Sequence, residues 1–205
     1  MGQATRFTRL LSLCVILVVA SAAASRGCQA QVPAESDWPS LDTHASSSPV
    51  VLDVINVHNT VGLHFKSVFL RVYSDRTAEC RHMRFGYDGD KERVKVKKLS
   101  PEEYARLQSV LHAPDLRAAK EHYDLVGFVM DSWMTWEINL PDGTSSQRIA
   151  IDNFGRGAEN ALEKAYPVAV VRLGCTLERL RREVYGADSV FPNTDLTRAC
   201  ERETR

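Results

Sequence analysis

The clearest hydrophobic pattern in the chain lies in residues 131–153. Apolar and polar side chains alternate along its first half, which is the two-residue period of a β-strand with one buried face. The apolar positions are Met134, Trp136, Ile138 and Leu140. Residues 141–143, Pro-Asp-Gly, form a turn signal, after which Ile149 and Ile151 resume the apolar face. The stretch predicts a β-hairpin, and other elements must cover its apolar face because a lone hairpin is barely stable.

Similar patterns predict four strands in the first half of the domain. They are expected at residues 50–57, 64–74, 77–83 and 93–99, with a turn at 85–90. In the fourth strand, Val94 and Val96 are expected to face the core. The alternating basic residues around them would then face solvent, as on an edge strand protected from aggregation.

Two longer helices follow from capping signals and periodicity. Ser100, Pro101 and Glu103 form an N-cap, a first-turn proline and a capping box, which predict a helix over residues 100–112. The last helix begins near Pro167 and is expected to end at Gly186. Its apolar stripe consists of Val170, Leu173, Leu177, Leu180 and Val184.

The element order predicts an α+β fold with a mostly antiparallel sheet of about five or six strands and two main helices packed on one face. We expect a single domain over residues 50–186 and an irregular C-terminal tail over 187–205. The chain of 205 residues is long enough for a real hydrophobic core.

The N-terminal region has the pattern of an export signal. Arg6 and Arg9 precede an apolar run of 15 residues, 10–24, which is short for a membrane span. Cleavage before Ser25 or before Gln31 would release the protein, whereas lipidation of Cys28 would tether it. Residues 31–49 are polar and rich in Ser and Pro, and predict a flexible linker. The expected location is therefore periplasmic or extracellular, with membrane contact only through the signal or a lipid on Cys28.

Charge and cysteine content agree with export. Without the three basic residues of 1–30, the chain has 23 basic and 26 acidic residues, a net charge of minus three that disfavours nucleic-acid binding. Cys175 and Cys200 are the preferred disulfide in an oxidising compartment. A Cys80–Cys175 pair and three reduced, buried cysteines remain as alternatives.

Several segments together resemble a family of small exported bacterial domains of unknown function. The similar segments are VFLRVYSDRTAECRHM, KLSPEEYARLQSVL, a Tyr-Asp near residue 123, TWEINLPDGTSSQRIAIDNF and a closing helix that begins at a proline. The resemblance spans about residues 50–186 and implies the strand, helix, hairpin and helix order already derived. It implies no activity, so no catalytic residue is transferred from it.

Catalytic and metal-binding motifs are missing from the sequence. No nucleophile elbow, phosphate-binding loop, dinucleotide fingerprint or zinc-ligand spacing occurs, and we expect no cofactor. The alternative to a binding role is a small thiol-dependent or hydrolytic enzyme that uses Cys80 with His82, two residues apart on one strand.

The leading hypothesis is a non-enzymatic domain that binds an unknown protein or small ligand. Strand alternation turns Trp133 away from Trp136, which leaves it either exposed as a contact surface or covered by the loop at 115–126. The candidate binding surface consists of Trp133, Thr135, Glu137, Tyr123, Asp124 and Asp131.

Overall fold

The computed structural model describes residues 41–60, 63–84, 91–124, 132–142, 145–154, 162, 166–186 and 200–201. These residues all belong to one unit, Ala34–Arg205. The predicted signal with Cys28, the turn at 85–90 and most of the predicted tail at 187–205 lie outside the described residues.

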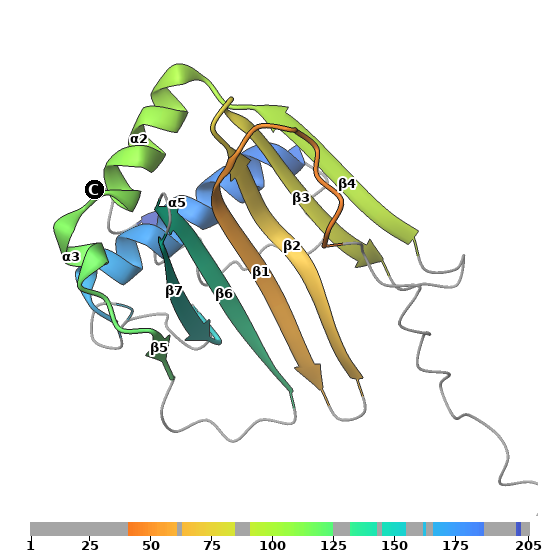
Figure 1. The fold of residues 1–205 in the computed structure, drawn as a ribbon. Helices are drawn as coiled ribbons and strands as arrows, with labels where there is room; N and C mark the ends of the chain where they lie inside the picture. Colours follow the sequence, from red (N-terminus) through yellow and green to blue (C-terminus); the bar gives the residue numbers. More distant parts are fainter. Residues whose placement is uncertain are drawn as a thin grey trace, which may run out of the picture. The chain divides into compact units, whose positions relative to one another are not determined.

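A mixed sheet of seven strands forms the centre of the described structure, in the order β4-β3-β2-β1-β6-β7-β5 (Figure 1). The strands are β1 (Val50–Thr60), β2 (Leu63–Tyr73), β3 (Thr77–Arg84), β4 (Lys91–Lys98), β5 (His122–Tyr123), β6 (Ser132–Asp142) and β7 (Ser145–Asp152). Neighbouring strands are antiparallel, except that β5 runs parallel to β7. The α+β class is confirmed. The seventh strand, β5, and its parallel pairing were not predicted.

The helices within the described residues are α2 (Pro101–Leu111), the one-turn α3 (Pro114–Arg117) and α5 (Val168–Tyr185). At the start of α2, the Ser100 side chain accepts from the Glu103 amide at 3.1 Å, and the Glu103 carboxylate accepts from the Ser100 amide at 2.6 Å. The predicted capping box is therefore present. The last helix ends at Gly186, whose φ of 64° suits glycine.

One face of the sheet, called here the inner face, packs against α5 (Figure 1). Its fully buried side chains include Leu52, Leu70, Ile138, Ile149 and Ile151, and α5 supplies Leu173, Leu177 and Leu180. Helix α5 and the residues just after β7 approach closely at Gly174, where a Cβ would overlap the ring of Phe154. The spacing of apolar residues along the predicted strands and the last helix is thus explained by one shared core.

The edge strand β4 presents the face opposite to the predicted one. Val94 and Val96 are 41% and 54% exposed on the other side of the sheet, called here the outer face. Lys97 faces the helices, with its Nζ 3.1 Å from Glu103 of α2 and 3.6 Å from Glu183 of α5. Ion pairs of Lys97 with the two helices thus lie on the inner side of β4, and the prediction for Val94 and Val96 was wrong.

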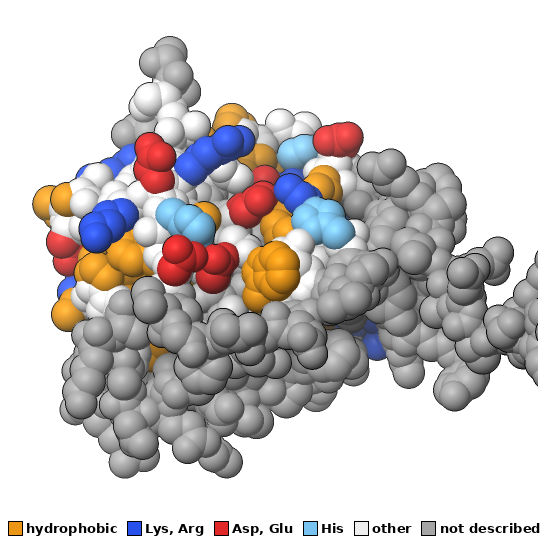
Figure 2. Space-filling view, turned by 90° about the horizontal axis from the view of Figure 1, so that it is seen from below, with side chains coloured by type: hydrophobic (Ala, Val, Ile, Leu, Met, Phe, Trp, Pro, Cys, Tyr) orange, Lys and Arg blue, Asp and Glu red, His pale blue; other side chains and the backbone are white. Residues whose placement is uncertain are grey.

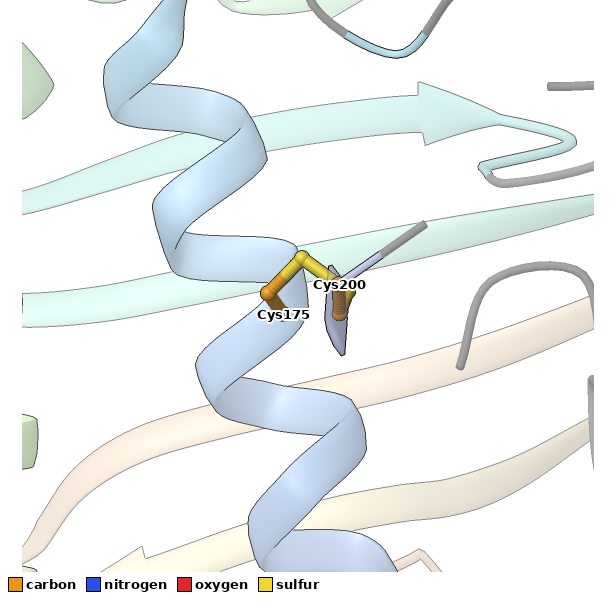
Figure 3. The surroundings of a disulfide bond; sticks show 2 residues. All are labelled: Cys175 and Cys200. Atoms are coloured by element: carbon orange, nitrogen blue, oxygen red, sulfur yellow. A yellow bond between two sulfur atoms is a disulfide. The ribbon is translucent and has the colours of Figure 1, made fainter. Parts of the chain in front are cut away.

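A disulfide joins Cys175, in the middle of α5, to Cys200 (Figure 3). The two Cα atoms are 5.3 Å apart, within the usual range for a disulfide. Cys80 is the free cysteine of the described residues and is buried. The preferred pairing is confirmed, and the bond fixes residue 200 to the last helix.

Residues 41–49 lie against the outer face instead of forming the end of a flexible linker. Leu41 packs on a small apolar group made by Ile55, Val57 and Val68. The Arg71 guanidinium donates to the carbonyl oxygens of Leu41 at 3.0 Å and Thr43 at 3.3 Å. These nine residues, called here the covering segment, are therefore part of the folded domain. The remainder of the predicted linker lies outside the described residues.

Beneath the covering segment lies a buried ionic network. Arg71 is 3% exposed and bonds to Asp53 at 2.9 Å and to Glu79 at 3.3 Å, while Glu79 is fully buried and also binds Arg81 at 3.1 Å. Tyr73 donates its hydroxyl proton to Glu79 at 2.5 Å. Burial and the Glu79 carboxylate raise the pKa of Tyr73, so the hydroxyl remains protonated. Glu79 is thus the shared acceptor of the network.

Replacing Glu79 tests how much this network stabilises the fold. Glu79→Ala should lower the free energy of unfolding by about 3–5 kcal/mol, because buried arginines lose their common carboxylate. Urea denaturation followed by circular dichroism measures the change. Glu137→Ala is the matched control: it removes a half-exposed partner of Lys66 and should cost less than about 1 kcal/mol. Equal losses in the two variants would contradict a stabilising network.

Candidate functional site

An aromatic and charged group lies on the outer face, on β6 and on β2, which β1 separates from β6. Trp133 is 47% exposed and lies opposite Asn59 of β1. The Lys66 ammonium of β2 reaches across β1 to the Glu137 carboxylate at 3.3 Å. We call Lys66, Trp133, Thr135 and Glu137 the outer patch. Strand alternation places the three β6 residues on one side, so the outer patch follows directly from the register of β6.

A second group borders the outer patch through Thr135. The short strand β5 pairs with β7, and the Ala150 amide donates to the Glu121 carbonyl at 2.8 Å. This pairing brings the His122 Nε2 atom to 3.2 Å from Asp152 Oδ2 and 3.3 Å from Asp124 Oδ1. The ligand atoms of His122, Asp124 and Asp152 all lie within 4.8 Å of one another. We call these three residues the His–Asp cluster.

Hydrogen bonds hold the Asp152 end of this cluster in place. The Thr135 hydroxyl donates to Asp152 Oδ1 at 2.6 Å, which links the cluster to the outer patch. The next residue, Asn153, has a φ of 50° and exchanges two hydrogen bonds with the Met134 backbone, at 2.6 and 3.0 Å. Since Asn is one of the few residues that tolerates this conformation, Asn153 locks the end of β7 to β6.

Seen from below, acidic, histidine, basic and hydrophobic side chains lie next to one another on the surface (Figure 2). In the outer patch and the His–Asp cluster together, three carboxylates face one lysine and one histidine. The group thus has acceptors in excess, together with an exposed indole ring. Such a surface can bind a cation or a partner that supplies hydrogen-bond donors.

The sequence-predicted surface residues divide into three sets. Trp133, Thr135 and Glu137 share the outer face, and Asp124 approaches them through His122 and Asp152. Tyr123 does not belong with them, and Asp131 lies outside the described residues.

Tyr123 points to the inner face, because it follows His122 on the same strand and consecutive side chains alternate. Its ring packs at 6.3 Å from that of Tyr166, and its hydroxyl accepts from the Lys120 amide at 2.9 Å. Its inclusion in the binding surface was therefore wrong. His122 and Asp152 were missed because they lie thirty residues apart in the sequence, and no motif spacing connects them.

Cys80 does not have the environment of a catalytic thiol. Its side chain is fully buried on the inner face, and the loss of solvent raises its pKa far above the ordinary value. A cysteine nucleophile needs access to substrate and a thiolate at working pH. His82 follows two residues later in β3. The presence of Cys80 in this strand, which suggested a thiol enzyme, is thus explained by its packing in the core.

Thiol labelling provides a direct check on Cys80. In the folded protein with its disulfide intact, Cys80 should remain unlabelled by iodoacetamide over hours, and should react within minutes once the chain is unfolded in guanidinium chloride. Mass spectrometry of the tryptic peptides measures both states. Rapid labelling of Cys80 under native conditions would contradict this assignment and restore the thiol enzyme as a hypothesis.

No protein-family model matches this chain, and no curated protein shows significant sequence similarity to it. The resemblance to small exported bacterial domains therefore remains a prediction. In the part of the chain that is described, no helix combines the length and apolar character needed to cross a membrane.

Proposed function

We propose that this chain is an exported, non-enzymatic binding domain that receives a protein or small-molecule partner on the outer patch. The exposure of Trp133 is the observation that carries the proposal. A tryptophan ring contributes a large apolar area on burial, and exposed tryptophans are enriched at binding surfaces. Nearly half of the Trp133 surface remains exposed after folding, so a partner can bury apolar area that folding leaves in contact with water.

The charges beside Trp133 support a partner of a particular chemistry. Glu137 lies on the same side of β6, four residues from Trp133. The Asp152 carboxylate lies next to this group, because it accepts a hydrogen bond from Thr135. A partner with a basic or amine group could pair with these carboxylates and place the cation against the indole face. The backbone under the patch is held by three paired strands, so little conformational entropy would be lost on binding.

Site-specific photocrosslinking in the producing cells tests this proposal. A benzophenone amino acid at position 133 of the exported protein should give one discrete adduct, identified by mass spectrometry. The matched control carries the same group at Val168, which is 61% exposed at the start of α5 and far from the patch in sequence. Adding Glu137→Arg to the position-133 variant should reduce the adduct, because it reverses a charge of the patch.

The identified partner then allows an affinity measurement with purified protein. Trp133→Ala should weaken binding by about 30-fold, the effect of losing roughly 2 kcal/mol at an aromatic hot spot. Val168→Ala should leave the affinity unchanged. The same adducts at both positions, or none at position 133, would contradict a binding role for the outer patch.

The intact mass of the exported protein tests the location. We expect a chain that has lost its signal, either by cleavage before Ser25 or Gln31 or with a lipid on Cys28 as the new N-terminus. The mass should also show one disulfide, and non-reducing peptide mapping should assign it to Cys175 and Cys200. A full-length mass in the cytoplasmic fraction would contradict export while leaving the crosslinking test valid.

A further inference from the structure

The His–Asp cluster has the ligand types and spacing of a metal site. Two ligands that each lie about 2.1 Å from one ion in a tetrahedral or octahedral arrangement are about 3.0–3.4 Å apart. The His122 Nε2 atom lies 3.3 Å from Asp124 Oδ1 and 3.2 Å from Asp152 Oδ2. Both carboxylates therefore already occupy positions next to the imidazole nitrogen that suit adjacent ligands of a single ion.

We propose that His122, Asp124 and Asp152 bind a divalent transition-metal ion of the zinc class. An imidazole nitrogen with two carboxylates suits zinc, whereas magnesium and calcium prefer oxygen ligands alone. The ligand oxygens of Asp124 and Asp152 lie within 4.8 Å of each other. The Asp124 side chain is 66% exposed, so it can rotate to bring its oxygen closer to that of Asp152. Three protein ligands leave one coordination position open to solvent.

The contacts around Asp152 support a metal ligand at this position. Carboxylates that bind metals are commonly oriented by a second hydrogen bond, and the Thr135 hydroxyl supplies one to Asp152 Oδ1 at 2.6 Å. Oδ2, the other oxygen, is the one that faces His122. Thr135 is therefore a positioning residue that leaves one carboxylate oxygen directed at the ion.

The site would also connect β5 to the end of β7, two segments that pair at only two positions. His122 belongs to β5, a strand of two residues, and Asp152 ends β7 thirty residues later. An ion held between them would add to the few hydrogen bonds of this parallel pair. A protonated imidazole bridging two carboxylates accounts for the same distances without a metal, and it is the outcome against which the site must be tested.

Isothermal titration with zinc chloride, on protein prepared without a histidine tag and stripped with a chelator, tests the proposal. One zinc ion should bind per chain, and magnesium or calcium at the same concentration should not compete. His122→Ala and Asp152→Asn should each weaken zinc binding at least tenfold. Thr135→Val should weaken it by about tenfold, and Thr135→Ser, which keeps the hydroxyl, should restore most of the affinity.

His112→Gln is the matched control, because His112 is an exposed histidine at the end of α2 and should not affect zinc binding. Nitrogen-15 spectra of the histidine side chains should show that zinc shifts the His122 Nε2 resonance. If His122→Ala unfolds in a thermal melt, Asp124→Asn on its exposed side chain serves in its place. Absence of zinc binding, or equal loss in His112→Gln and His122→Ala, would overturn the site and identify the cluster as an ion pair.

Discussion

The antiparallel pairing of β1 with β6 is the contact on which the rest of the structure depends. It joins the strands β1 to β4 and the β6–β7 hairpin into one sheet. Its register sets Val54 beside Ile138 on the inner face and Val57 beside Thr135 on the outer face. A shift by one residue would move Trp136 out of the core and its polar neighbours into it. Burial of the inner face therefore selects the register, and the register in turn determines which residues form the outer patch.

The outer face contains two kinds of ion pair, one buried and one exposed to solvent. Around Arg71, the covering segment excludes water, and the guanidinium is satisfied by Asp53, Glu79 and two carbonyl oxygens. Charges can be buried in a sheet only with such complete pairing. Lys66 and Glu137 instead pair at the surface, where an ion pair contributes little to stability. The needs of folding thus account for the Arg71 network, but they do not account for an exposed tryptophan beside the surface pair.

Local signals in the sequence were sufficient for much of the fold. The capping box at Ser100 acts within a few residues and the alternation along β6 within one strand, so these patterns predict structure without knowledge of the tertiary fold. The orientation of β4 could not be predicted in this way. Alternation shows that Val96 and Lys97 lie on opposite faces, but only the positions of α2 and α5 decide which face is covered. The covering segment was likewise missed, because its polar composition gives no sign of the buried Arg71 that it satisfies.

The candidate site was only partly predictable, for a related physical reason. Trp133, Thr135 and Glu137 follow from the period of one strand, which the sequence displays directly. His122 and Asp152 come together through a parallel pair of two residues, and parallel strands have no turn between them to mark their pairing. The hydrogen bond from Thr135 to Asp152 then joins the predictable and unpredictable parts into one surface. A ligand that contacts both parts would bind more tightly when β5 is paired with β7. Binding on this face and the pairing of β5 are therefore thermodynamically linked.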